Sequence, residues 1–131
     1  GRDDTFVMGS SMGGLVSLYA VARHPQTFGG AAALSTHWPA CGGCMIDWFA
    51  AHLPPRRTHR LYFDFGTATL DARYPPFQAR MDAALTRAGW RRGAQWQTRR
   101  FEGAEHNEAA WRARAAHPLR FLLAPAGKRA R

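Results

Sequence analysis

Apolar residues recur with two different periods along the chain, and the alternation between the two periods predicts a series of strands and helices. Short apolar or β-prone runs that end at Gly, Ser or a loop indicate strands. Stretches with apolar residues three or four positions apart, ended by Pro or Gly, indicate helices. We expect strands near Thr5–Met8, Gly30–Ser35, Arg60–Phe65 and Trp96–Phe101. We expect helices over Gly14–Arg23, Met45–His52, Pro76–Ala88 and Asn107–Ala116, with a last turn at Pro118–Leu123.

This regular alternation predicts the fold class. Strands joined by helices form a parallel sheet, and right-handed crossovers cover it with helices. We therefore expect an α/β fold with about four parallel strands and helices on both faces. Residues 1–123 contain no internal repeat or linker and are expected to belong to one domain. Residues 124–131, with Pro, Gly and three cations, are expected to form a flexible basic tail.

The length and the charge narrow the function classes. A chain of 131 residues is about one domain, and its net charge of +9 would suit a nucleic-acid or membrane surface. However, Lys128 is the single lysine among 18 basic residues, and the arginines lack the interleaved aromatic residues of a single-strand binding groove. We expect this charge to be solvated surface, with no nucleic-acid partner. No stretch approaches the roughly twenty apolar residues of a membrane span, so no membrane partner is expected.

The two cysteines form the run Cys41-Gly42-Gly43-Cys44, whose spacing suggests redox or metal chemistry. A structural zinc site needs four ligands, and the sequence has no second cysteine pair. A thioredoxin-like pair would begin a helix in a different βαβ setting. We expect a local disulfide or two free thiols, and no metal or other cofactor. The compartment stays open between cytoplasmic and secreted or periplasmic.

The segment Gly9–Gly13 reads G-x-S-x-G and lies between the first predicted strand and the first predicted helix. In this setting the motif forms a nucleophile elbow, a sharp turn around a reactive serine. Side chains two residues before and after the serine are expected to collide with the crossing strand and helix, so both positions require glycine. Ser11 has glycines at both places, whereas Ser10 would be flanked by Met8 and Met12. The motif predicts Ser11 as a nucleophile and the backbone N–H of Met12 as an oxyanion-hole donor. The alternative is an ordinary turn between a strand and a helix.

A serine nucleophile needs a base, and the base needs a third group that fixes its tautomer. His106 follows the last predicted strand and precedes a helix, where an α/β-hydrolase carries its histidine. The acid is expected just after the predicted strand that precedes the histidine strand, which is Arg60–Phe65. Asp71 lies in the turn beyond the end of that strand and is the first choice, followed by Asp64 within the strand and then by Glu105.

His37 and Trp38 follow the second predicted strand at the same edge of the sheet. This position suits a substrate-binding role, and a loop capped by an aromatic residue is the alternative. The remaining histidines are expected to be surface residues: His24, His52, His59 and His117.

Four ordered motifs give the chain a family resemblance. They are Val7–Gly14, Ser35–Pro39, Gly66-Thr67 with Asp71, and Gly103–Glu108 with Trp111. Up to about Leu123 the chain resembles the esterase D and enterochelin-esterase-like family of α/β-hydrolases. The resemblance implies that Ser11 is the nucleophile, His106 the base and Asp71 the acid. It also implies hydrolysis of a small-molecule carboxylic ester through an acyl-enzyme.

The nucleophile of an α/β-hydrolase follows its fifth strand, whereas here the elbow begins at Gly9. We therefore expect residues 1–123 to be the C-terminal portion of a single α/β-hydrolase domain. An N-terminal half or a partner would then cover the first strand and supply the second oxyanion donor. Two alternatives remain: an inactive fragment that serves as a binding or interaction module, and an acyltransferase that uses the same three residues.

Overall fold

A computed structural model describes residues 1–125 of the chain. In this part of the chain, four parallel strands form one sheet in sequential order. They are β1 (Phe6–Ser10), β2 (Gly30–Leu34), β3 (Arg60–Gly66) and β4 (Trp96–Phe101). The helices are α1 (Met12–Arg23), α2 (Cys44–Ala51), α3 (Pro75–Arg87), α4 (Glu108–Arg114) and α5 (Ala116–Leu123). The α/β fold class expected from the sequence is confirmed.

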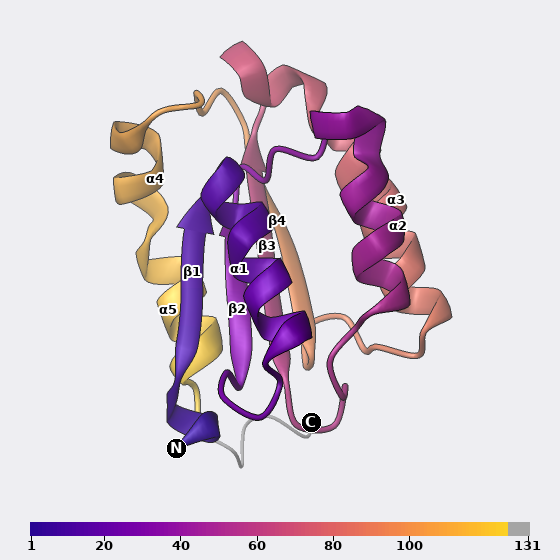
Figure 1. Ribbon diagram of the computed structural model, residues 1–131. Helices are drawn as coiled ribbons and strands as arrows, with labels where there is room; N and C mark the ends of the chain where they lie inside the picture. Colours follow the sequence, from indigo (N-terminus) through magenta and orange to yellow (C-terminus); the bar gives the residue numbers. More distant parts are fainter. Residues whose placement is uncertain (126–131) are drawn as a thin grey trace.

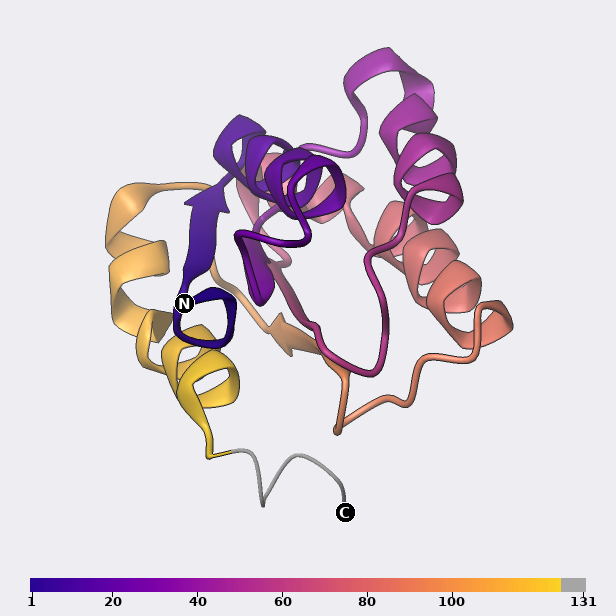
Figure 2. The ribbon, with the colours of Figure 1, turned by 60° about the horizontal axis from the view of Figure 1, so that its bottom comes forward.

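The helices form two layers, one on each face of the sheet. The three helices that connect the strands, α1, α2 and α3, cover one face, and α4 and α5 cover the other (Figures 1 and 2). A sheet that grows in one direction through crossovers of one hand places all its connecting helices on the same face. Within the described residues, α4 and α5 follow the last strand and do not connect two strands. The crossover rule therefore does not restrict them, and they pack on the opposite face.

The larger core lies between the sheet and α1, α2 and α3. This core contains Leu18 and Val21 of α1, Phe49 of α2 and Phe63 of β3. The alanines of β2 leave room for α1 to approach, because a Cβ atom built on Gly14 would lie 3.3 Å from the Cβ of Ala33. The smaller core, on the other face, joins Ala32, Leu34 and Tyr62 to Leu122 of α5.

Most element boundaries lie within two residues of the sequence-based expectation, and the larger differences are in the helices after β4 and in short 3₁₀ turns. The helix expected over Asn107–Ala116 ends at Arg114, and α5 begins at Ala116. Proline lacks an amide N–H and is tolerated in the first turn of a helix, so Pro118 suits the start of a new helix. A 3₁₀ turn over Thr69–Arg73 was not expected. Of the tail expected over 124–131, residues 126–131 lie outside the described residues.

The carboxyl ends of the four strands meet at the upper edge of the sheet in Figure 1. The loops after β1, β2, β3 and β4 all begin there, so residues far apart in the sequence come together at this edge. Within residues 1–125, no helix is both long enough and apolar enough to cross a membrane.

Candidate active site

Ser11 connects β1 to α1 through a strained backbone. Its φ and ψ of 55° and −120° lie outside the usual regions for a residue with a side chain. The Ser11 N–H donates to the carbonyl of Leu34 at 2.9 Å, and the Ser11 carbonyl accepts from the N–H groups of Gly14 and His37. These contacts hold the side chain at the carboxyl edge of the sheet.

The two glycines of the motif play different roles. A Cβ atom on Gly9 would lie 2.4 Å from the carbonyl oxygen of Gly13, a distance that no folded backbone tolerates. A Cβ atom on Gly13 would meet nothing within 4 Å. The expectation that both positions exclude side chains is therefore correct for Gly9 and wrong for Gly13. The backbone of Gly13 is what a side chain at Gly9 would collide with.

Ser11, His106 and Asp71 lie in one hydrogen-bonded row. The Oγ atom of Ser11 is 2.9 Å from Nε2 of His106, and Nδ1 of the same ring is 2.6 Å from Oδ1 of Asp71. Asp71 is fully buried, and the His106 side chain is 15% exposed. The structure thus brings together the three residues that the sequence proposed as nucleophile, base and acid.

Backbone contacts tie the loop that carries Asp71 to the loop that carries His106. The N–H groups of Thr67 and Ala68 both donate to the carbonyl of Ala104, and the N–H of His106 donates to Oγ1 of Thr69 at 2.9 Å. Gly66 permits this approach, since a Cβ atom there would lie 2.0 Å from the Ala104 oxygen. The spacing between acid and base is therefore set by backbone as well as by side chains.

The two other candidate acids point elsewhere. Asp64 is buried in β3, where Oδ1 lies 3.0 Å from Nη2 of Arg114 and Oδ2 accepts from the hydroxyl of Tyr62. Burial raises the pKa of Asp64, and the Arg114 guanidinium opposes that rise. Glu105 is exposed and accepts a hydrogen bond from Asn107. Among residues 1–125, only Asp71 of the three candidates is hydrogen-bonded to the His106 ring.

Tyr74 joins the site although no sequence pattern indicated it. Its ring is 1% exposed, and its hydroxyl lies 2.9 Å from Nδ1 of His37 and 3.4 Å from Nδ1 of His106. Burial and the nearby charge of Asp71 raise the pKa of Tyr74 above its ordinary value. The hydroxyl therefore stays protonated and is able to donate one hydrogen bond within the site.

His37 and Trp38, both proposed for substrate binding, lie in different environments. His37 is half-buried beside Tyr74, at the same edge as Ser11. Trp38 is 1% exposed in the larger core, where its Nε1 donates to the Gln78 amide oxygen. The expectation that Trp38 lines the substrate site is wrong, because packing of the ring against Phe63 turns it away from solvent.

Of the four histidines expected at the surface, His59 is instead buried. Its ring nitrogens lie 3.0 Å and 2.8 Å from the carbonyl oxygens of Pro55 and Pro25, so it joins two loops at the amino edge of the sheet. The ring is a structural link, remote from Ser11.

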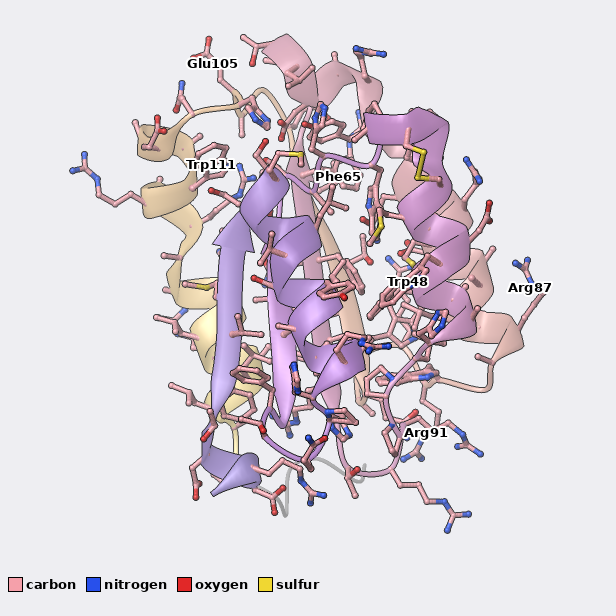
Figure 3. The ribbon with its side chains drawn as sticks, viewed as in Figure 1. Trp48, Phe65, Arg87, Arg91, Glu105 and Trp111 are labelled. Carbon is pink, nitrogen blue, oxygen red and sulfur yellow. A yellow bond between two sulfur atoms is a disulfide. The ribbon has the colours of Figure 1, made fainter. Side chains whose placement is uncertain are left out.

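A second group of polar side chains lies behind Asp71. Ser35, at the end of β2, donates to Oδ2 of Asp71 at 2.5 Å, and Trp111 and Arg114 of α4 both donate to Ser35. Figure 3 shows Trp111 between α4 and the carboxyl end of the sheet, below the loop that carries Glu105. Nothing in the sequence distinguished Arg114 from the other arginines.

The remaining candidate groups are a backbone amide and the cysteine pair. Met12 begins α1, and the first N–H groups of a helix have no partner within it, so the Met12 amide suits an oxyanion donor. Cys41 and Cys44 form a disulfide. Within the described part of the chain, no three His, Cys, Asp or Glu side chains gather closely enough to hold a metal ion.

A parallel sheet whose strand leads through a strained serine into a helix, with a histidine in the loop after a later strand, defines an α/β-hydrolase. The family model described as "Putative esterase" matches residues 1–122. The chain therefore belongs to this esterase family. No curated protein sequence matches it.

Solved structures share the fold. A ferulic acid esterase matches 92% of this chain with 51% of its own, at 18% identity and a TM-score of 0.69. An S-formylglutathione hydrolase from Staphylococcus aureus also matches 92% of this chain with 51% of its own, at 17% identity and a TM-score of 0.69. An enterochelin esterase from Shigella flexneri matches 95% of this chain with 32% of its own, at 24% identity and a TM-score of 0.71. The chain thus spans about half the length of the first two and about a third of the third.

Proposed function

We propose that this chain carries the catalytic residues of a serine carboxylic-ester hydrolase that works through an acyl-enzyme. The observation that supports the proposal most is the row of Ser11, His106 and Asp71, with separations of 2.9 Å and 2.6 Å. A nucleophile, a base within reach of its proton and a carboxylate that orients the base are the parts that acyl transfer requires.

In the first half of the reaction, the Oγ atom of Ser11 attacks the ester carbonyl carbon while Nε2 of His106 takes the serine proton. Asp71 holds Nδ1–H and stabilises the imidazolium that forms. The amide of Met12 donates to the oxyanion of the tetrahedral intermediate. When the intermediate collapses, the bond from carbon to the alcohol oxygen breaks and His106 passes its proton to the leaving alcohol.

In the second half, water attacks the acyl group on Ser11. His106 takes a proton from the water and returns it to Oγ of Ser11 as the carboxylic acid leaves. His106 takes up and returns each proton within the cycle, and no step changes an oxidation state, so the proposed reaction requires no metal or redox cofactor. The substrate in this proposal is a small-molecule ester. The neighbouring structures are named as a ferulic acid esterase, an S-formylglutathione hydrolase and an enterochelin esterase.

A complete oxyanion hole contains a second donor, which α/β-hydrolases take from the loop after their third strand. We propose that a segment or partner beside β1 supplies it. β1 pairs only with β2 within the described residues, so its other edge is open to a further strand. Met8 in β1 and Met12 at the start of α1 are both exposed.

Hydrolysis of p-nitrophenyl acetate tests the proposal, with Ser11→Ala compared against Ser10→Ala. The neighbouring serine is a matched control because it has the same side chain one residue away. We expect Ser11→Ala to reduce turnover to the buffer rate and Ser10→Ala to stay within about threefold of the parent. Asp71→Asn should cost up to about 10⁴-fold, as the equivalent change does in serine proteases. Equal turnover by Ser11→Ala and the parent would refute the proposal.

A further inference from the structure

Arg114 carries a charge that is almost completely buried. The residue is 3% exposed, and Nη2 donates to Oγ of Ser35 at 2.7 Å and to Oδ1 of Asp64 at 3.0 Å. Its Nε and Nη1 atoms are buried without a hydrogen-bond partner among residues 1–125. Burying a guanidinium with unpaired nitrogens is costly, so packing alone does not account for this arginine.

The contacts of Ser35 fix the direction of its hydroxyl proton. A hydroxyl has one proton to donate and two lone pairs that accept. Arg114 and Trp111 approach the oxygen at 2.7 Å and 3.0 Å, and both of these groups only donate. They occupy the lone pairs, so the Ser35 proton must point to Asp71, whose Oδ2 lies 2.5 Å away. The charge of Arg114 polarises the hydroxyl in the same direction.

This hydrogen bond determines what Asp71 offers to the histidine. Oδ2 accepts from Ser35 and from the N–H of Gly66 at 2.6 Å, which leaves Oδ1 facing Nδ1 of His106. An acceptor at that place favours the tautomer with the proton on Nδ1. Nε2 is then the acceptor that faces the Ser11 hydroxyl. The orientation set at Arg114 therefore reaches Ser11 through four consecutive hydrogen bonds.

We propose that Arg114 is a positioning residue that acts through Ser35 to hold Asp71, and hence His106, in the arrangement that activates Ser11. The inference deepens the proposed function and rests on it. Ser35 has a φ of 43°, in the left-handed region, so the end of β2 adopts a strained conformation at the residue that makes this contact.

The alternative is that Arg114 only neutralises the buried carboxylates, Asp64 at 3.0 Å and Asp71 at 3.9 Å from its Nη2 atom. That role would stabilise the fold, because removing one partner of a buried ion pair leaves the other charge unpaired. It would not alter the reactivity of the molecules that remain folded. The two roles thus differ in the rate per folded molecule, and that rate is what the experiment measures.

The experiment measures the rate of fluorophosphonate labelling, corrected for the folded fraction, in Arg114→Met, Ser35→Ala and the double variant. Arg112→Met is the matched control, since Arg112 is exposed on the same helix. We expect Arg114→Met and Ser35→Ala each to slow labelling about 10- to 100-fold, and the control to leave it unchanged. Because Arg114 acts through Ser35, the double variant should be no slower than Ser35→Ala alone. Arg114→Lys should recover part of the loss and replaces Arg114→Met if that variant does not fold.

A second readout needs no catalysis. The short bond between His106 and Asp71 should give a low-field proton resonance from Nδ1–H in the parent and in Arg112→Met, weakened or shifted upfield in Arg114→Met and Ser35→Ala. If the parent and its variants show this pattern but the parent is not labelled, the proposed function fails, and only the effect of Arg114 on the bond between His106 and Asp71 is supported. Three results would overturn the positioning role. The first is that the parent lacks the resonance, and the second is that Arg114→Met has the same labelling rate and the same resonance as the parent. The third is that the losses in labelling rate add up in the double variant.

Discussion

At the scale of single residues, Ser11 keeps a backbone conformation that only its surroundings make tolerable. Positive φ with ψ of −120° is unfavourable for a residue with a Cβ atom. Hydrogen bonds at the Ser11 N–H and carbonyl offset that cost. The lack of a side chain at Gly9 leaves room for the Gly13 backbone to pass. The strain has a chemical use, because it presents Oγ at the tip of the turn, within reach of His106.

The two glycines of the elbow provide a residue-scale prediction. Gly9→Ala should lower the free energy of unfolding by about 2 to 4 kcal/mol and abolish labelling of Ser11, because the new methyl group collides with backbone. Gly13→Ala should change stability by less than about 1 kcal/mol, since the site is open and alanine favours helix. Urea unfolding of both variants is the measurement. Comparable losses in the two variants would contradict the geometry.

The residues that the sequence predicted and the structure brings together are those recognised by their position relative to the predicted strands. Ser11, His106 and Asp71 each follow the end of a strand, and the order of nucleophile, acid and base is a property of the sequence itself. Arg114 was not predicted, because its selection depends on which helix face meets the sheet. Trp38 and His37 were proposed on the same pattern, the loop after the second strand, although their rings lie in different environments.

At the scale of elements, the loop between β4 and α4 links the sheet to the base. His106 is followed by Asn107, whose side chain accepts the N–H of Ala110 at 2.9 Å and so caps α4. The cap fixes the point where the loop ends and the helix begins, one residue after His106. The same helix contributes Trp111 and Arg114 to the group behind Asp71, so its position affects both sides of the site.

Removal of this cap provides an element-scale prediction. Asn107→Ala should lower the free energy of unfolding by about 1 kcal/mol and slow labelling of Ser11, because an uncapped first turn loosens the His106 loop. Asn107→Asp keeps an acceptor at the same place and should preserve both properties. Thermal unfolding and the labelling rate are the measurements. Identical behaviour of the two variants would show that the cap does not hold the loop.

The sequence predicted most elements to within two residues, because hydrophobic period and terminating Pro or Gly residues are local signals. The strand expected over Trp96–Phe101 has those bounds in the structure. The separation of α4 from α5 was less visible, since the apolar spacing continues across Ala115. The 3₁₀ turn at Thr69–Arg73 was not predicted because contacts with the His106 loop, distant in sequence, hold it in place.

At the scale of the whole molecule, two buried tyrosines lie in different parts of the fold. Tyr62 packs under α5, and Tyr74 lies at the carboxyl edge near α3. Burial, together with the charges of Asp64 and Asp71 respectively, raises the pKa of each phenol above its ordinary value of 10. In the unfolded chain both phenols ionise near that ordinary value.

This difference predicts how stability depends on pH. Below about pH 10 both phenols are protonated in the folded and unfolded states, and their contribution is constant. Above it the unfolded chain loses protons that the folded chain keeps, so stability falls as pH rises. The midpoint of urea unfolding should therefore be constant below about pH 10 and decrease as the pH rises above it. Tyr62→Phe should have a lower urea midpoint at neutral pH, and its midpoint should decrease less steeply with rising pH. If the variant shows the same decrease as the parent, Tyr62 is not one of the groups responsible.

The central claim is that Ser11 is a nucleophile activated by His106, and fluorophosphonate labelling located by peptide mass spectrometry tests it most directly. Trypsin releases residues 3–23, which hold Ser10, Ser11 and Ser17, so fragmentation of this peptide must place the adduct. We expect a single adduct on Ser11 of the folded chain, lost in Ser11→Ala and His106→Ala and absent after denaturation. An adduct on another serine, or labelling at an equal rate in His106→Ala, would contradict the account.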